Sequence, residues 1–366
     1  MRIITLSLLL CGLVIQSFGV RPPLKGYTYA SEQAPTGKEW QSPENLALNK
    51  EQPHAWFFPF QDIKSARKVL PENSIYWQSL NGNWKFNWAA DPDSRPKDFY
   101  KTDFDVTAWD NIPVPSSWNI YGVQQDGSLK YGVPIYVNQP VIFMHSVKAD
   151  DWRGGVMRTP PTNWTTYKYR NEVGSFRREF EIPEHWDGRE VFISFDGVDS
   201  FFYLWINGMY VGFSKNSRNT ANFNITNYLR SGKNIVAAEV YRNSDGSFLE
   251  AQDMFRLPGI FRTVALYSTP KVQIRDLVAT PDLDNNYTDG SLTIQADIRN
   301  FGKKTAKGYK VCYSLYANKL YSDENEPVIL ARDTKGAAIR NSVVAQVEPI
   351  TTGNTQESGS ESKKSE

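Results

Sequence analysis

The stretch FFYLWINGMYVGFS, residues 201–214, places the pair Asn207-Gly208 between two runs rich in aromatic and aliphatic residues. An Asn-Gly pair is typical of a two-residue type I′ turn, because both residues tolerate the positive φ angles that this turn needs. Two apolar runs joined by such a pair predict an antiparallel β-hairpin. The fold of this part of the chain is therefore expected to start from paired strands.

Further strand-like runs lie on both sides of this hairpin. Residues 76–88 carry Trp84, Phe86 and Trp88 at the period of two that marks a half-buried strand. Many short strands with Gly, Asp and Asn turns, and one short helical candidate at residues 62–70, predict an all-β sandwich. The other runs are GSFRREFEI (174–182), REVFISFDGV (189–198), KNIVAAEVYR (233–242) and IFRTVALYS (260–268).

A second β region follows a shift in composition at Pro270. Alternating runs at residues 291–300 and 309–317 are typical of strands and predict an immunoglobulin-like sandwich over residues 270–349. Such a sandwich needs about seven strands in about 100 residues, and convincing strands run out before that number is reached, so we expect it to be incomplete. Residues 350–366 are almost entirely polar, and we expect a disordered tail there.

Residues 1–19 have a basic start, a long apolar run, and the small residues Ser17 and Gly19 ahead of a cleavage point. This pattern is typical of a secretory signal peptide, and the run is too short to span a bilayer comfortably. We therefore expect a secreted or periplasmic protein. Removal of the peptide would leave Cys312 as the only cysteine, which excludes a disulfide within one chain. Residues 20–75 are rich in Pro and polar residues, and they predict an extended amino-terminal arm that packs its aromatic side chains elsewhere.

The composition excludes several classes of function. The chain of 366 residues carries 41 basic and 40 acidic side chains, so it offers no electrostatic reason to expect nucleic acid or a membrane surface as a partner. No later segment has the run of about 18 apolar residues expected of a membrane helix. Three scattered histidines and one remaining cysteine give no transition-metal site. Aromatic residues make up 14% of the chain, which suits both pleated sheets and sugar surfaces.

The segment SDGSFLEAQDMFRLPGIFR, residues 244–262, holds three carboxylates, three phenylalanines, two arginines and two glycines in one loop-like stretch. We do not expect a catalytic centre in it. Asp245 is expected to supply a turn, and Glu250 is expected to form a local ion pair with Arg256 or Arg262.

The motifs of the first β region resemble the amino-terminal part of glycoside hydrolase family 2, in particular its large bacterial β-galactosidases. The resemblance implies a jelly-roll, galactose-binding-like sandwich over residues 76–269 and an immunoglobulin-like sandwich over residues 270–349. In the family, a barrel with two catalytic glutamates follows and acts by a retaining mechanism. That barrel is absent from this sequence, so no catalytic residue is assigned. The motifs are SLNGNWKF (79–86), IPVPSSW (112–118), YGVPIYVN (131–138) and EAQDMFRLPGIFR (250–262), with a long segment at residues 144–174 that resembles versions from gut Bacteroidetes.

The same resemblance implies two substrate-binding residues. Asp253 would reach into the cleft of the barrel, where it would contact sugar hydroxyls and a sodium ion; a carboxylate suits both, as an acceptor and as a hard oxygen ligand. Asn138 would hydrogen-bond the sugar. Gln139 departs from the small apolar residue of well-known relatives, which leaves the aglycone side open. No cofactor is expected in this chain, and sodium and magnesium would belong to the full-length parent.

Two functions of different class remain open. The chain is either a non-catalytic amino-terminal part of a secreted β-galactosidase-like hydrolase, inactive by itself, or a stand-alone carbohydrate-binding module. The unfinished second sandwich favours the first, because folded proteins normally cover exposed sheet edges. The expected partners are a β-galactoside or a plant or host glycan, the parent's catalytic barrel and, through the arm, a second copy in a homo-oligomer. β-Glucuronidase or β-mannosidase activity of the parent stays open, although EAQDMFRLPGIFR favours a galactosidase.

Overall fold

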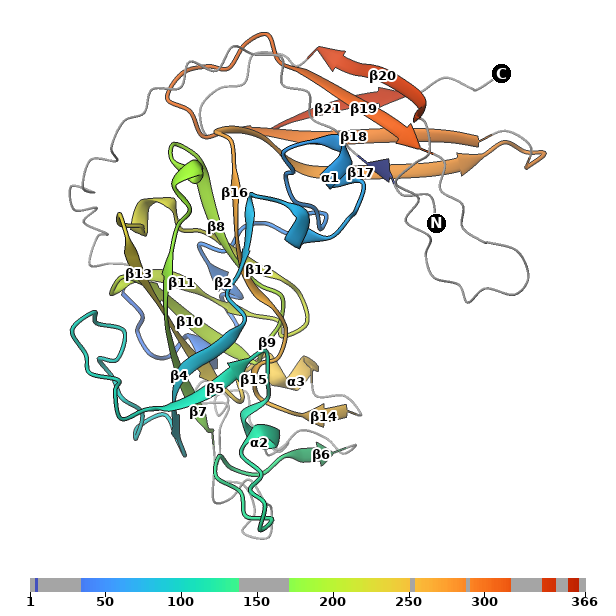
Figure 1. The fold of residues 1–366 in the computed structure, drawn as a ribbon. Helices are drawn as coiled ribbons and strands as arrows, with labels where there is room; N and C mark the ends of the chain where they lie inside the picture. Colours follow the sequence, from blue (N-terminus) through green and yellow to red (C-terminus); the bar gives the residue numbers. More distant parts are fainter. Residues whose placement is uncertain are drawn as a thin grey trace.

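The computed structural model describes residues 4–5, 34–137, 171–250, 254–287, 290–316, 338–346 and 355–361. In these ranges the chain is almost entirely β structure, arranged as a larger and a smaller sandwich (Figure 1). The strands pair antiparallel throughout. The predicted all-β fold is confirmed.

Two sheets form the larger sandwich, the jelly roll. One has seven strands in the order β2-β11-β10-β13-β7-β4-β5, and the other has four in the order β12-β8-β16-β3. The seven-stranded sheet consists of β2 (Ala47–Leu48), β4 (Gly82–Ala89), β5 (Asp110–Val114), β7 (Val173–Glu181), β10 (Phe201–Ile206), β11 (Met209–Lys215) and β13 (Lys233–Tyr241). The four-stranded sheet consists of β3 (Trp77–Ser79), β8 (Glu190–Phe195), β12 (Ala221–Asn224) and β16 (Val264–Thr269).

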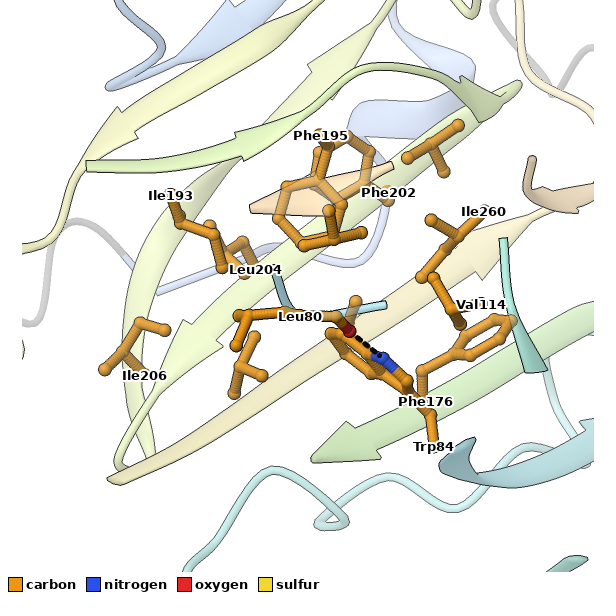
Figure 2. Close-up of a cluster of buried hydrophobic side chains, with 14 of the residues drawn as sticks. Leu80, Trp84, Val114, Phe176, Ile193, Phe195, Phe202, Leu204, Ile206 and Ile260 are labelled. Carbon is orange, nitrogen blue, oxygen red and sulfur yellow. Dashed lines mark hydrogen bonds between the residues drawn. The ribbon is translucent and has the colours of Figure 1, made fainter. Parts of the chain in front are cut away.

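The main core lies between these two sheets. Figure 2 shows aliphatic and aromatic side chains from both sheets meeting there, among them Phe195 and Phe202, whose ring centroids are 4.8 Å apart. Trp84 is almost fully buried, and its indole Nε1 donates a hydrogen bond to the Leu80 carbonyl oxygen at 2.8 Å. The one polar atom of this large side chain is therefore satisfied inside an otherwise apolar layer.

The hairpin predicted from residues 201–214 is present. Strands β10 and β11 pair antiparallel, and the turn between them has φ angles of 53° at Asn207 and 80° at Gly208. Asn207 is buried, and its side-chain amide donates to the Tyr228 carbonyl oxygen at 2.8 Å. The turn is therefore held by a side-chain hydrogen bond to another segment as well as by the preference of its two residues for positive φ angles.

The outer face of the seven-stranded sheet is also covered, so β10 is buried on both faces. Segments without long regular structure provide the cover. Trp40 from the arm stacks on Tyr241 with ring centroids 5.4 Å apart, and Tyr100 stacks on Trp205 at 4.9 Å. A second cluster of mainly aromatic side chains therefore lies outside the sandwich core.

The described part of the arm, from residue 34 to residue 75, lies along both sandwiches. Its strand β2 extends the seven-stranded sheet beside β11, so the sheet includes residues before position 76, where we expected the jelly roll to begin. Its helix α1 (Ile63–Ala66) begins after Asp62, whose carboxylate accepts a hydrogen bond from the Ser65 amide at 2.7 Å. Short 3-10 turns occur at Glu39–Gln41, Pro71–Asn73, Glu184–Trp186 and Thr226–Tyr228.

The arm also contacts the smaller sandwich. The Ala55 amide donates to the Asp276 carboxylate at 2.8 Å, and Arg299 pairs with Glu51 at 2.6 Å. The two β regions are thus joined both through the chain at Pro270 and through a segment that precedes the jelly roll.

The smaller sandwich has two three-stranded sheets, in the orders β17-β18-β21 and β1-β19-β20. They share a small core that includes Ile274, Ile298 and Val311. This region is where the sequence predicted the immunoglobulin-like sandwich. Its strands are β1 (Ile4–Thr5), β17 (Val272–Leu283), β18 (Gly290–Asn300), β19 (Lys310–Tyr316), β20 (Ala338–Gln346) and β21 (Thr355–Glu361).

Two of these strands lie where the sequence predicted none. Strand β21 occupies Thr355–Glu361, within the tail expected to be disordered, and β1 lies within the expected signal peptide. Sheet pairing uses backbone N–H and C=O groups, so a polar segment can pair with a free strand edge such as that of β18. Composition alone did not reveal that edge. No helix in the described ranges is long and apolar enough to cross a membrane.

Candidate functional site

Several short elements gather at one end of the jelly roll (Figure 1). Two of them, β6 and β14, pair antiparallel as a two-stranded unit that we call the β6–β14 ribbon, with Val137 opposite Met254. A second short pair, β9 with β15, connects this end to the core strands. The elements are α2 (Trp118–Tyr121), β6 (Ile135–Val137), β9 (Val198–Asp199), α3 (Ser247–Glu250), β14 (Met254–Arg256) and β15 (Gly259–Ile260).

Both predicted sugar residues, Asn138 and Asp253, lie outside the described residues. Their neighbours in the chain do not: Val137 precedes Asn138, Met254 follows Asp253, and these two neighbours are register partners in the ribbon. The backbone pairing thus brings Val137 and Met254 together, although they are far apart in the sequence. The roles of the Asn138 and Asp253 side chains stay predictions.

Helix α2 is attached to the chain that leads out of the ribbon. The Trp118 amide donates to the Pro258 carbonyl oxygen at 3.2 Å, and the Ser116 amide donates to the Ile260 carbonyl oxygen at 2.8 Å. Trp118 is fully buried and is part of the main core. The motif around residues 112–118 therefore anchors the site end to the sandwich.

Asp245 forms the expected turn, and it also makes a contact that the sequence did not predict. The Ser247 amide donates to the Ser244 carbonyl oxygen at 3.0 Å, which closes the turn around Asp245. The Asp245 carboxylate pairs with Lys215 at 2.9 Å, and the two side chains are only 6% and 1% exposed. The Asp245 carboxylate is thus part of a buried ion pair that joins this turn to the end of β11.

The predicted ion pair of Glu250 with Arg256 or Arg262 is wrong. The Glu250 carboxylate instead accepts hydrogen bonds from the Ser217 amide at 2.6 Å and from its hydroxyl at 2.5 Å. Arg262 donates to the Arg218 carbonyl oxygen at 2.8 Å. Arg256 is 9% exposed, and burial lowers its pKa. Sequence proximity suggested the pairing, whereas a serine brought in from another strand end satisfies Glu250.

Asp199 is a further carboxylate at this end that sequence reasoning missed. It accepts a hydrogen bond at 3.0 Å from the same Ser217 hydroxyl that contacts Glu250. Burial raises the pKa of Asp199 to about 6, and the nearby Glu250 carboxylate adds to that rise while Ser217 and Arg218 oppose it. Burial thus moves the protonation of the Asp199 carboxylate towards neutral pH.

The described residues provide no metal centre. No group of three or more His, Cys, Asp or Glu side chains within them lies close enough together to hold a metal ion. Two small pockets flank Phe57, between the arm and the strands β8, β12 and β16, and lie apart from the ribbon. Because Asp199 and Glu250 both contact Ser217, we interpret them as loop-fixing groups rather than a catalytic pair.

Comparison with known proteins places this geometry in a family. Residues 77–270 match the family described as glycosyl hydrolases family 2, sugar binding domain. The chain belongs to glycosyl hydrolase family 2. The matched residues are the jelly roll with its β6–β14 ribbon, so the resemblance drawn from the motifs is confirmed.

Curated relatives carry the name β-galactosidase. That of Priestia megaterium is 42% identical over 264 residues, which cover 72% of this chain and 24% of the relative. The β-galactosidase large subunit of Lactobacillus helveticus is 32% identical over 296 residues, covering 78% and 44%. The chain thus spans about a quarter of the first relative and less than half of the second.

Solved structures share the fold at low sequence identity. A β-glucuronidase of Bacteroides uniformis has a TM-score of 0.54 at 16% identity, covering 79% of this chain and 27% of that one. A family 2 member from Bacteroides cellulosilyticus has a TM-score of 0.52 at 17% identity, covering 78% and 31%. At such identities these neighbours establish the sandwich architecture and nothing about the sugar.

Proposed function

We propose that this chain is the amino-terminal part of a secreted β-galactosidase-like glycoside hydrolase and that it contributes residues to the substrate cleft of the whole enzyme. The observation that carries the proposal is the match of residues 77–270 to a family 2 sugar binding domain, together with 42% identity to a β-galactosidase. The parent would release terminal β-galactosyl groups by a retaining mechanism, which needs two carboxyl groups about 5 Å apart across the bond that is cleaved. The chain itself would be inactive.

Asn138 and Asp253 are the proposed substrate contacts. The pairing of Val137 with Met254 supports this assignment, because it brings together the backbone positions next to both residues. Asp253 would accept hydrogen bonds from galactosyl hydroxyls and would offer an oxygen to a sodium ion, while Asn138 would bond a neighbouring hydroxyl. Sodium and magnesium would act in the full-length parent.

Hydrolysis of a nitrophenyl β-galactoside by the purified chain tests the proposed inactivity. We expect no release above the uncatalysed rate, with an intact β-galactosidase as the positive control. Release at a rate comparable to that control would refute the inactivity of the chain.

A stand-alone carbohydrate-binding module is the second candidate. Phe255 and Tyr121, which are 63% and 48% exposed at the ribbon end, favour it because exposed rings stack on the C–H faces of sugars. Calorimetric titration with lactose and galactan separates the candidates. Binding that is lost in Asp253→Ala and in Asn138→Ala supports the cleft assignment, whereas binding that survives both changes but is lost in Phe255→Ala supports the module.

Export and self-association belong to the same proposal. We propose that residues 1–19 are removed on secretion, so amino-terminal sequencing of the exported protein should begin at Val20. We also propose that the arm over residues 20–75 forms a subunit contact, which light scattering of the chain with and without residues 20–45 would test. Export with residues 1–19 retained would contradict the first point.

A further inference from the structure

Glu172 is a fully buried carboxylate in the residue just before β7, at the same end of the jelly roll as the β6–β14 ribbon. One of its oxygens, Oε2, accepts three hydrogen bonds: from Trp118 Nε1 at 2.9 Å, from Asn119 Nδ2 at 3.1 Å and from Trp88 Nε1 at 3.4 Å. The other oxygen, Oε1, pairs with Arg242 Nη1 at 2.5 Å. The carboxylate is therefore held on both sides, by donors from β4, from α2 and from the first residue after β13.

Arg242 extends this contact to the two chain segments of the ribbon. Its Nη2 donates to the carbonyl oxygen of Val133, just before β6, at 2.8 Å, and to that of Arg256, in β14, at 3.5 Å. The Arg242 amide also donates to the Glu172 carbonyl oxygen at 3.0 Å. One guanidinium thus joins the buried carboxylate to backbone on both sides of the ribbon, a geometry that suits its planar fork of donors.

Gly132 shows how closely the chain before β6 approaches the carboxylate. Its φ is 76°, and a Cβ added there would lie well inside contact distance of all three carboxylate atoms of Glu172. Because four donors hold Glu172, that side chain has no room to retreat. The path of the backbone into β6 is therefore set directly by the position of Glu172.

We propose that Glu172 and Arg242 are positioning residues that fix the β6–β14 ribbon relative to the jelly roll. The consequence for sugar binding rests on the proposed function, since Asn138 and Asp253 directly adjoin this ribbon, but the positioning itself does not. A buried ion pair is a weak source of net stability, because apolar side chains of similar volume often serve as well. The Glu172–Arg242 pair is buried and bonds the backbone on both sides of the ribbon. We therefore explain it by the geometry that it imposes on the ribbon rather than by a gain in net stability.

The Arg242→Lys variant separates positioning from charge compensation. Lysine keeps a positive charge next to Glu172, but as a point charge it lacks the planar fork that reaches Val133 and Arg256. Hydrogen–deuterium exchange of the full chain is the measurement. We expect amides of residues 133–137 and 254–260 to exchange about tenfold faster or more, as loss of a charge-assisted hydrogen bond implies, while β8 and β16 keep their protection.

Glu190→Gln is the matched control. Glu190 is another buried carboxylate, paired with Lys271 and bonded to Asn224 in the four-stranded sheet away from the ribbon. Its loss should leave exchange of the ribbon unchanged. Unchanged ribbon exchange in Arg242→Lys, or an equal increase over the whole jelly roll, would overturn the proposal.

A glycine pair keeps the test decisive if Arg242→Lys fails to fold. Gly132 and Gly127 both have positive φ, at 76° and 80°, but an added Cβ at Gly127 meets no atom within 4 Å. Gly127→Ala therefore carries the backbone strain alone, and Gly132→Ala adds the collision with Glu172. Faster ribbon exchange in Gly132→Ala only would support the positioning role, and equal exchange in both variants would refute it. Neither readout needs a sugar, so the failure of galactoside binding stays a separate result.

Discussion

The two faces of the seven-stranded sheet are buried in different ways. The inner face packs against a second sheet through apolar side chains, whereas the outer face is covered by the arm and by loops, and its aromatic rings carry polar groups. Tyr203 donates to Glu39, Tyr241 donates to Glu239 at 2.8 Å, and Arg95 pairs with Glu239 at 2.9 Å. Regular strands can cover an apolar face by shape alone. Irregular segments need directional bonds to hold their place, because their own backbone groups are not paired in a ladder.

Removal of a large ring from the inner face should have the largest effect. Trp84→Ala is expected to lower the free energy of unfolding by about 4 kcal/mol, because it leaves a cavity between two sheets and removes one of the two hydrogen bonds that the Leu80 carbonyl oxygen accepts. Urea unfolding followed by circular dichroism measures it. Trp56, which is 59% exposed, is the control, and Trp56→Ala should cost less than about 1 kcal/mol. Equal losses would mean that the inner face is not the main core.

Breaking the buried pair at the edge of the outer layer should cost less. Lys215→Met would leave the Asp245 carboxylate buried without its cation, and we expect a loss of about 3 kcal/mol. The double variant Lys215→Met/Asp245→Leu should recover most of it, since both charges are then gone. If the double variant is as unstable as the single one, the pair contributes more than mutual compensation.

The buried carboxylate of Asp199 should make the free energy of unfolding depend on pH. Its folded pKa of about 6 lies above the unfolded value of about 4, so the folded state binds the extra proton between these values. The contribution of this group is therefore greatest below pH 4 and is lost as the pH rises to about 6. Asp199→Asn should remove that slope and be more stable than the wild type above pH 6, by up to about 3 kcal/mol for two pKa units. Thermal unfolding from pH 4 to 8 measures the difference, and parallel curves would exclude a shifted Asp199.

An exposed ion pair on the same sheet should matter least. Lys233 pairs with Glu179 at 2.9 Å, but the two side chains are 62% and 60% exposed. Lys233→Ala is expected to leave the free energy of unfolding nearly unchanged, and 0.5 M salt should abolish any difference that remains. A loss close to that of Lys215→Met would show that burial is not what distinguishes the two pairs.

The sequence predicted what depends on neighbours along the chain. The alternation in residues 76–88 gave strand β4, the Asn207-Gly208 pair gave the hairpin, and the ordered motifs gave the family. These signals are local, and each one is repeated over several residues. They located the ribbon end because Asn138 and Asp253 belong to motifs that also form its two strands.

The sequence did not predict what depends on distant partners. Glu172 and Arg242 are 70 positions apart, and Lys215 and Asp245 are 30 apart, so no spacing rule connects them. Glu250 was assigned to nearby arginines because sequence proximity was the only guide. One sequence signal could have pointed to Arg242, which directly follows the apolar run of β13. A charged side chain at such a position is costly to bury, so its burial requires a partner of opposite charge.

The arm has a consequence for the order in which the protein can fold. Trp40 is made early, but the ring on which it stacks, Tyr241, follows it by 201 residues (241 − 40). At a synthesis rate of about 5–20 residues per second, the arm waits about 10–40 seconds before its partner exists. During that time its tryptophan and phenylalanine side chains have no surface to cover. The nascent chain should therefore be a substrate for chaperones until β13 emerges, and protease digestion of chains stalled before residue 233 should remove the arm while chains stalled after the jelly roll retain it.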